Sequence, residues 1–155
     1  MNDNHAHYHT PETLDEEKPS IIVLPTCKGI VAIPVRQIIR IQSISNYSKL
    51  FFKDACPATG GSKTLVVAKV LHWFQEQAGL FSFVRIHRTH FVNIQYIQSY
   101  SGSKSGLLLL QNGEQFSVAR RKKAALSQKL NNLNIFIRTD QVVTPSYITG
   151  KSFAA

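Results

Sequence analysis

The sequence predicts a mainly β domain built from many short antiparallel strands, with one short inserted helix and a C-terminal helix. Two observations predict this class. Short apolar runs rich in Ile, Val, Phe and Tyr recur along the chain, separated by clusters of Gly, Pro, Asn and Ser. Only two segments instead space their apolar residues three and four apart, as helices do. The length of 155 residues suits one such domain with tails.

The chain begins with a polar segment and continues as strands. Residues 1–20 are acidic and interrupted by Pro11 and Pro19, so we expect them to be disordered and their three histidines to hold no specific metal. We expect Pro34 at a strand end or sheet edge, and Ser45-Asn46 as a tight turn. The expected strands are IIVLP from residue 21, then 30–35, 38–45 and 47–53, followed by a loop at 54–62 and the strand KTLVVA.

The second half begins with a helix and returns to strands. Lys69–Ala78 has helical spacing, and Gly79 predicts its end. Asn112-Gly113 between apolar runs is a strong hairpin signal, and a last helix is expected from about Arg120 to Asn132. The expected strands are SFVRI, HFVNI, IQSYS, GLLLLQ and EQFSVA. The domain is therefore predicted to span residues 21–133, with residues 134–155 as an extension of uncertain structure.

Charge is distributed unevenly along the chain. Residues 1–20 hold five acids and one base, a net charge of −4, whereas residues 21–155 hold 17 bases and four acids, a net charge of +13. A body this basic favours a polyanionic partner, with nucleic acid as the first choice and an anionic membrane surface as the second. A merely soluble basic protein is the plain alternative.

The remaining composition points to a cytoplasmic protein. Cys27 and Cys56 lie far apart and outside any CxxC pattern, which predicts free thiols in a reducing compartment rather than a disulfide framework or a zinc ribbon. We find no secretory signal. No apolar run approaches the roughly 18–20 residues that span a bilayer.

The run FVRIHRTHFVNIQYI places Arg85, His87, Arg88 and His90 among strand-forming residues. A metal site at the two histidines would lack further ligands, because the run contains no Cys, Asp or Glu. Acid–base catalysis on a phosphodiester would lack a nucleophile or a metal. We interpret the run as a loop that presents Arg and His to phosphates and base edges. A structural role for His87 in the core is the alternative.

Two other segments carry side chains suited to DNA. Four cations, residues 120–123, stand at the start of the last predicted helix, where they oppose the helix dipole. An arriving phosphate would neutralise them and bind the first-turn N–H groups, although a solvated basic face would look the same. In the predicted turn at residues 46–49, Asn46 and Ser48 can donate to bases and Lys49 can meet a phosphate.

These segments, in this order, resemble the LytTR family of bacterial DNA-binding domains. The resemblance rests on "I..I.S..NY" from Ile38 to Tyr47, "F.R.HR...VN...I" from Phe83 to Ile97, and "G..F.V.RR....L" from Gly113 to Leu126. It covers about residues 30–130. It implies an elongated arrangement of antiparallel sheets, in which loops at one edge, rather than a recognition helix, enter successive major grooves.

The resemblance also implies roles for single residues. The base-contacting positions would be Ser48, Arg88 and Arg121. Phosphate contacts or supporting positions would be Asn46, Lys49, Arg85, His87, Thr89 and Arg120, to which the helix-terminus argument adds Lys122 and Lys123. Ala119 departs from the family, since many members have Ser there. About 30 residues precede the domain, so we expect no receiver domain or membrane helix before it.

We therefore expect sequence-specific DNA binding by a bacterial transcriptional regulator, with no catalysis, no cofactor and no metal. The expected partners are double-stranded DNA with paired repeats, a second copy of the chain on DNA, and a separate signalling protein, but no membrane. The alternative is a basic β domain that binds or cleaves RNA by stacking bases on exposed aromatics. We expect the available aromatics, Phe81, Phe83, Phe91 and Tyr96, to be buried, which disfavours RNA. A protein-interaction module is a weaker third hypothesis.

Overall fold

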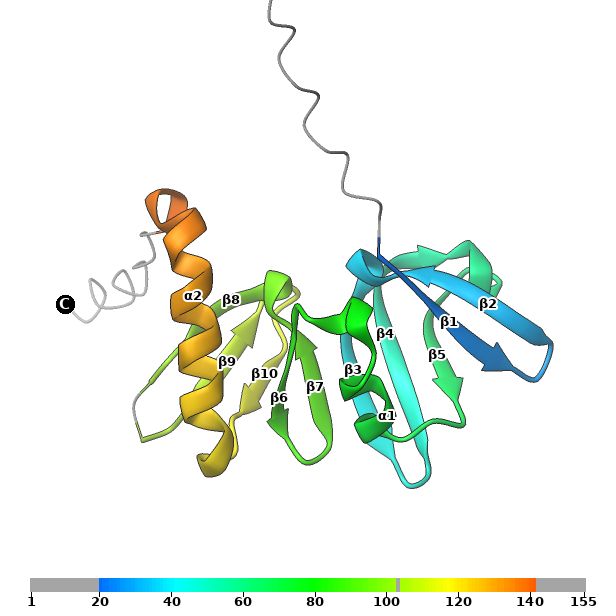
Figure 1. The fold of residues 1–155 in the computed structure, drawn as a ribbon, viewed down its shortest axis with the longest axis horizontal. Helices are drawn as coiled ribbons and strands as arrows, with labels where there is room; N and C mark the ends of the chain where they lie inside the picture. Colours follow the sequence, from blue (N-terminus) through cyan, green and yellow to red (C-terminus); the bar gives the residue numbers. More distant parts are fainter. Residues whose placement is uncertain (1–19, 103, 142–155) are drawn as a thin grey trace, which may run out of the picture.

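The structure is a computed structural model that describes residues 20–102 and 104–141. These residues form an elongated, mainly β fold with a short helix in the middle and a long helix at one end, as the sequence predicts (Figure 1). The strands are β1 (Ile21–Thr26), β2 (Gly29–Pro34), β3 (Ile38–Ile44), β4 (Tyr47–Cys56), β5 (Ser62–Val67), β6 (Phe83–His87), β7 (His90–Asn93), β8 (Ile97–Tyr100), β9 (Leu107–Leu110) and β10 (Gln115–Ser117). The helices are α1 (Leu71–Gln75) and α2 (Lys123–Gln141), with five short 3-10 turns between elements.

The strands form three antiparallel sheets. The central sheet has the order β5-β4-β3-β7-β6, and it is flanked by the hairpin β1-β2 and by the sheet β10-β9-β8. Pro34 ends β2 in the two-stranded sheet, which confirms the position predicted for a residue without an N–H donor. The tight turns predicted at Ser45-Asn46 and Asn112-Gly113 are also present.

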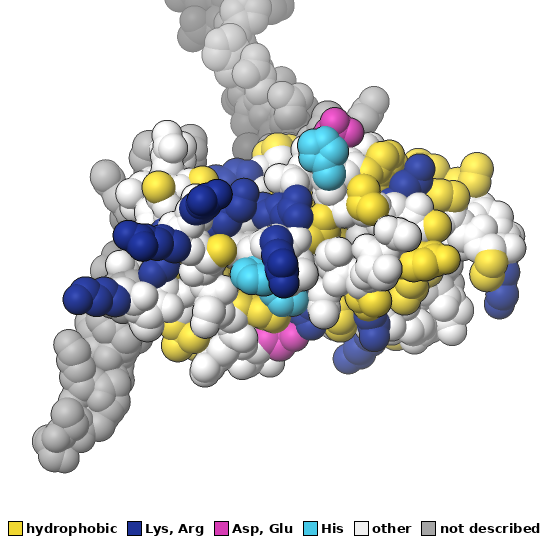
Figure 2. Space-filling view, turned by 90° about the horizontal axis from the view of Figure 1, so that it is seen from below, with side chains coloured by type: hydrophobic (Ala, Val, Ile, Leu, Met, Phe, Trp, Pro, Cys, Tyr) yellow, Lys and Arg dark blue, Asp and Glu magenta, His cyan; other side chains and the backbone are white. Residues whose placement is uncertain are grey.

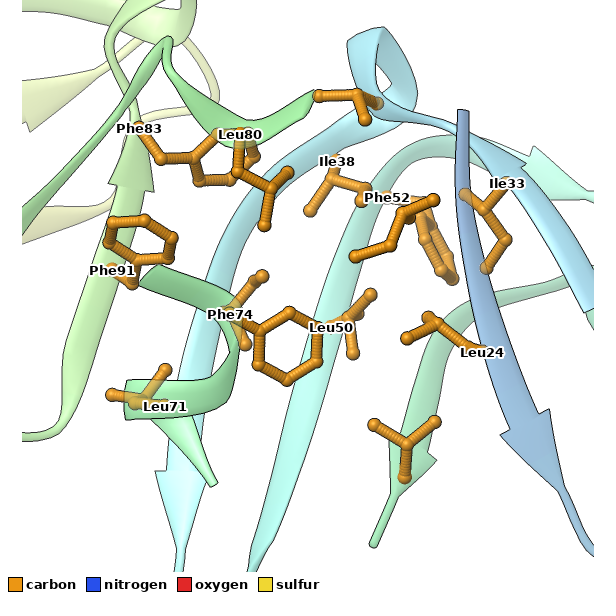
Figure 3. Packing of buried hydrophobic residues seen from close by; sticks show 14 of the residues in the cluster. Leu24, Ile33, Ile38, Leu50, Phe52, Leu71, Phe74, Leu80, Phe83 and Phe91 are labelled. Atoms are coloured by element: carbon orange, nitrogen blue, oxygen red, sulfur yellow. The ribbon is translucent and has the colours of Figure 1, made fainter. Parts of the chain in front are cut away.

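The central sheet separates two hydrophobic cores. On one face β1, β2 and α1 close a core around the fully buried side chains of Leu24, Leu50 and Phe74 (Figure 3). On the other face β8, β9 and α2 close a second core around Leu108, Leu110 and Leu126. Strands β6 and β7 contribute side chains to both cores, because successive side chains of a strand point to opposite faces of the sheet.

A bulge in β3 sets the direction of Arg40. Ile38 pairs with Phe52 and Arg40 with Phe51, so Ile39 is the extra residue. Ile38 packs in the first core and Ile39 in the second. Consecutive strand residues point to opposite faces in any case, so the effect of the bulge is on Arg40. The extra residue turns Arg40 toward the second face, where it meets Phe116.

Several boundaries differ from the sequence predictions. Helix α1 covers only Leu71–Gln75, because the chain turns after it to bring Leu80 into the same core as Phe74. The predicted loop at 54–62 is shorter, since β4 continues to the buried Cys56. Helix α2 begins at Lys123, after a 3-10 turn at Arg120–Lys122, and continues to Gln141.

Two further expectations concern the burial of the aromatic side chains and the two ends of the chain. Phe81 is 74% exposed, so the prediction that it is buried is wrong, whereas Phe83 and Phe91 are buried and Tyr96 is half-buried. The expectations for residues 1–19 and 142–155 lie outside the described residues.

Candidate nucleic-acid interface

Three connections lie along the lower edge of the molecule in Figure 1. They are the β3–β4 turn, the β6–β7 turn and the link from β10 to α2. Seen from below in Figure 2, Lys and Arg side chains gather from the α2 end to the centre, and hydrophobic side chains are more frequent toward the β1–β2 end. The positively charged part of this face therefore coincides with the segments in which the sequence places its candidate DNA contacts.

The β6–β7 turn is fixed from behind by Arg85. Its guanidinium donates to the carbonyl oxygens of His87 and Arg88 and, at 2.5 Å, to Oε1 of Gln75, the last residue of α1. Burial lowers the pKa of Arg85 from its ordinary value. Arg85 is therefore engaged by the protein itself and shapes the turn.

His87 and Thr89 fix the same turn from within. The backbone N–H of Thr89 donates to Nδ1 of His87 at 3.2 Å, and the Thr89 hydroxyl lies 2.8 Å from the same nitrogen. The carbonyl oxygen of Thr89 accepts from the N–H of Ser43 in the neighbouring hairpin. Arg88 stands exposed at the tip, and within the described residues its side chain has no hydrogen bond or ion pair.

The β3–β4 turn has a different construction. Ser45 adopts a positive φ of 54°, and Asn46 follows it, exposed, before β4 begins at Tyr47. A two-residue turn of this kind matches the twist of the strands that it joins. Asn46 is thus presented at the edge as the sequence predicts for a contact residue.

Ser48 does not lie in this turn, so that prediction is wrong. It is the second residue of β4, pairs with Ser43 and Val67, and has 0% of its surface exposed. Because side chains alternate along the strand, Ser48 faces inward with Leu50, whereas Lys49 lies on the opposite face, 5.3 Å from the Phe51 ring centroid. The Ser48 hydroxyl is buried without a hydrogen-bond partner and cannot meet a base in this conformation.

The link to α2 presents the second pair of arginines. The N–H of Ala119 donates to the carbonyl of Ile86 on β6 at 2.8 Å, which ties this link to the hairpin that carries Arg88. Arg120 and Arg121 follow in the 3-10 turn and are both exposed. The two arginine-bearing connections are therefore held to each other through the backbone.

The two lysines after these arginines are more enclosed. Lys122 is half-buried, and Nζ of Lys123 donates to the carbonyl of Lys104 at 2.9 Å. Gly106 has a positive φ of 52°, which favours glycine, and a Cβ there would lie 2.5 Å from Cε of Lys123, so the end of the lysine would have to move. Lys123 therefore holds the loop between β8 and β9, and its availability to phosphate is less than the sequence suggests.

Sequence reasoning missed a buried ion pair behind this edge. Arg40 on β3 is 6% exposed and donates to both carboxylate oxygens of Glu114. Its Nη2 and Nε lie 2.7 Å and 3.0 Å from Oε2, and Nε lies 3.1 Å from Oε1. Its guanidinium carbon lies 3.5 Å from the ring centroid of Phe51 and 5.1 Å from that of Phe116. The sequence shows Arg40 between isoleucines in the strand expected at residues 38–45, and nothing near it in the sequence points to Glu114.

This pair sets the electrostatics of its surroundings. Burial acts to raise the pKa of the Glu114 carboxyl, but hydrogen bonds from Arg40 and Asn112, together with the charges of Arg40 and His90, outweigh burial and lower the pKa. Burial lowers the pKa of His90, and the charges of Arg40 and His87 add to that effect. The His90 ring packs against that of Phe116 at an interplanar angle of 58°, with ring centroids 4.8 Å apart, so a neutral imidazole suits this position.

Within residues 20–102 and 104–141, no three His, Cys, Asp or Glu side chains gather in a way that could hold a metal ion. Among these residues no helix is both long and apolar enough to cross a membrane.

Known proteins resemble this chain in sequence and in structure. The profile of the LytTr DNA-binding domain matches residues 28–131. The sensory transduction protein LytR of Streptococcus agalactiae serotype V is 33% identical over 70 residues, which cover 44% of this chain and 28% of that protein. The LytTr DNA-binding domain of a Bacillus cereus protein described as a methyl-accepting/DNA response regulator superposes with a TM-score of 0.57 at 21% identity, over 72% of this chain and 96% of that one. Since the profile covers more than half of the chain, this protein belongs to the LytTr DNA-binding domain family.

Proposed function

We propose that this chain binds double-stranded DNA sequence-specifically, as the DNA-binding part of a bacterial transcriptional regulator. The observation that carries the proposal is one edge on which Asn46, Arg88, Arg120 and Arg121 are exposed on three adjacent connections. The stems behind the arginines are already fixed by hydrogen bonds. Loops that are ordered before binding lose less entropy on contact with DNA, which favours specific recognition.

Arg88 and Arg121 are the proposed readers of base edges. A guanidinium can donate two hydrogen bonds to O6 and N7 of guanine in the major groove. They stand on different connections, which suits contacts in successive grooves. Asn46 takes the place of Ser48 in the reading set, because its amide is exposed and can pair with adenine.

The other predicted contact residues divide into two groups. Arg120, Lys122 and Lys49 are proposed phosphate contacts, since charge without a fixed geometry suffices there. Four residues act indirectly, by shaping the loops, because their polar atoms are already bonded within the protein. These are Arg85, His87, Thr89 and Lys123.

The proposal includes no catalysis and no cofactor. Nδ1 of His87 accepts the N–H of Thr89, so the imidazole is occupied in shaping the turn. Two copies of the domain would occupy paired repeats, and a separate signalling protein would supply the input. Nuclease assays of the chain and of His87→Ala should both be blank, whereas metal-dependent cleavage lost in the variant would contradict this part.

Selection from a random duplex library tests the proposal as a whole. We expect an enriched motif, and its repeats would give the spacing of two copies. If about 5–8 phosphates are neutralised, log K against log salt should have a slope near −5 to −7. The absence of an enriched motif, together with a slope shallower than about −2, would overturn DNA recognition by this edge.

Single substitutions then separate reading from positioning. Arg88→Ala and Arg121→Ala should each weaken the preferred site by about 1–3 kcal/mol, leave random DNA nearly unchanged, and relax preference at one base pair. Lys122→Ala should weaken both kinds of DNA about equally. Lys28→Ala, at the exposed β1–β2 turn far from the edge, is the matched control and should change neither. Equal weakening of both DNAs by Arg88→Ala would make Arg88 a phosphate contact.

One observation keeps RNA as a second candidate. Phe81 and Tyr47 are 74% and 51% exposed, and exposed aromatic rings can stack on unpaired bases. Single-stranded RNA should therefore be included as a competitor. Tighter binding of RNA than of the selected duplex, reduced by Phe81→Ala, would favour this candidate.

A further inference from the structure

A groove separates α2 from the region of α1, and β6 forms its floor. Its volume is about 470 Å³. One wall comes from α1 and the segment after it, and the other from the first two turns of α2. The lining residues are Gln75, Glu76, Gln77, Leu80, Phe81, Phe83, Val84, Arg85, Phe91, Lys122, Ala125 and Lys129.

The groove is cationic and its lysines lack acidic partners. Arg85, Lys122 and Lys129 face one acid, Glu76, which already lies 3.3 Å from Nε2 of His72. In the described part of the chain neither lysine forms an ion pair. Nζ of Lys129 donates to the backbone carbonyl of Phe83, and burial lowers its pKa. A half-buried ammonium of this kind is stabilised by an incoming carboxylate.

The groove also offers apolar surface at its rim. Phe81 is 74% exposed, which is unusual for a side chain of this size, and Ala125 on the opposite wall is exposed as well. Leu80 lies beneath them and is buried. The surface therefore fits an apolar side chain flanked by carboxylates.

We propose that residues 12–17 of this same chain, the sequence ETLDEE, dock in this groove. Leu14 provides the apolar side chain against Phe81 and Ala125, and the acids around it provide carboxylates for Lys122 and Lys129. The segment is acidic where the groove is basic, and it contains four of the nine acids in the chain.

The point where the described chain begins supports this occupant over an unrelated protein. The carbonyl oxygen of Ser20 accepts from the N–H of Val35 at 2.8 Å, and a Cβ on Gly79 would lie 3.8 Å from that of Ser20. Gly79 directly precedes Leu80 and Phe81 at the rim. From Leu14 to Ser20 the chain can extend about 20 Å, so the segment starts beside its proposed site.

Docking would oppose DNA binding. Lys122 lines the groove and is also a proposed phosphate contact, and Arg85 lines the groove and fixes the turn that presents Arg88. A bound acidic segment would neutralise part of the edge proposed to meet DNA, and DNA would have to displace it. Only this consequence rests on the proposed function, because the docking itself needs no DNA.

Zero-length carbodiimide cross-linking of the full chain tests the docking without DNA. The reagent joins a carboxylate to an amine in contact, and mass spectrometry identifies the joined peptides. We expect residues 12–17 to be joined to Lys122 or Lys129 in preference to Lys53 and Lys63, which are exposed on β4 and β5. Leu14→Ser, which keeps every charge, should reduce these cross-links. Equal cross-linking to all four lysines would overturn the proposal.

A mixture of isotope-labelled and unlabelled chains identifies the source of the segment. Cross-links within one chain support the proposal, whereas mostly mixed pairs would assign the groove to a second copy and overturn docking in cis. In DNA binding, Leu14→Ser should raise duplex affinity about five-fold or more. Unchanged affinity despite lost cross-links would overturn the competition. If the unaltered chain forms the cross-links but binds no duplex DNA, the proposed function alone is contradicted.

Discussion

The two hairpins that meet in the central sheet are held in opposite ways. The β6–β7 hairpin is fixed at its tip, where Arg85, His87 and Thr89 bond the turn. The β3–β4 hairpin is fixed in its stem, where Arg40 stacks on Phe51 and pairs with Glu114 from the neighbouring sheet. Its tip, at Ser45-Asn46, makes no side-chain hydrogen bond within the described residues.

One edge of the molecule therefore combines a rigid turn with an adaptable one. A tip held in advance presents Arg88 in one geometry, which suits a bidentate contact that fails if the group is displaced. A tip that is held only through its stem can adjust to the backbone of the partner. In order of decreasing expected effect, substitutions at four places test this difference. They are the stem of the β3–β4 hairpin, the tip of the β6–β7 hairpin, the β3–β4 turn, and His90 beside the stem.

Glu114→Ala should give the largest loss of stability, because it leaves Arg40 buried and unpaired. Removing one partner of a buried pair costs about 3–5 kcal/mol, and we expect about 2–3 here because a third of the Glu114 side chain is exposed. Chemical denaturation measures this. Glu76→Ala, which removes an exposed carboxylate from a pair with His72, should change stability by about 0.5 kcal/mol or less. If the two substitutions had equal effects, the Arg40–Glu114 ion pair would not be what stabilises the stem of the β3–β4 hairpin.

Arg85→Met should come next, with a loss of about 1.5–2 kcal/mol. The substitution keeps much of the packing but removes charged hydrogen bonds to the turn carbonyls and Gln75. Amide hydrogen exchange should accelerate at Arg88 and Thr89 more than at Ser45 and Asn46. Arg36→Met, at an exposed arginine near β3, is the control. If exchange rose equally in both turns, the tip of β6–β7 would not be separately fixed.

Substitutions of Ser45 should have an intermediate effect whose sign depends on the residue. A side chain at φ 54° costs about 1–2 kcal/mol, which glycine avoids, so Ser45→Gly should stabilise by about 0.5–1 kcal/mol. Ser45→Val should destabilise by about 1 kcal/mol or more, since β-branched residues disfavour this region. Thermal unfolding of both variants measures the difference. Destabilisation by glycine would contradict a positive φ at Ser45.

The smallest effect should be the pH dependence caused by His90. Burial, Arg40 and His87 lower its folded pKa, although Glu114 opposes them, so the unfolded chain binds a proton more readily. Stability should therefore be constant above the ordinary imidazole pKa of about 6.5 and fall as pH decreases below it. Denaturation midpoints at pH 7.5 and 5.5 measure this. His90→Phe, which keeps the ring against Phe116, should reduce the fall, whereas His72→Gln at an exposed histidine should not.

Local signals in the sequence were enough to predict most strands and turns of this protein and the basic charge of its domain. Alternation and β-branched runs gave most strands, and Asn-Gly and Ser-Asn marked two turns, because these signals act between residues close in sequence. The motifs that resemble LytTR predicted the family to which the chain belongs. The helix boundaries were less predictable, since the end of α1 depends on where Leu80 must pack.

Which polar side chains are free to meet a partner, and which are bonded inside the protein, depends on contacts that form only in the tertiary structure. Arg40, Arg85 and Arg88 look alike in the sequence, yet the first is buried with Glu114, 74 residues away, the second holds a turn, and the third is exposed. Ser48 likewise lies one position beyond an exposed tyrosine and is fully buried. The physical reason is that a polar group becomes available or occupied through partners that folding brings from distant segments, and local patterns carry no information about them.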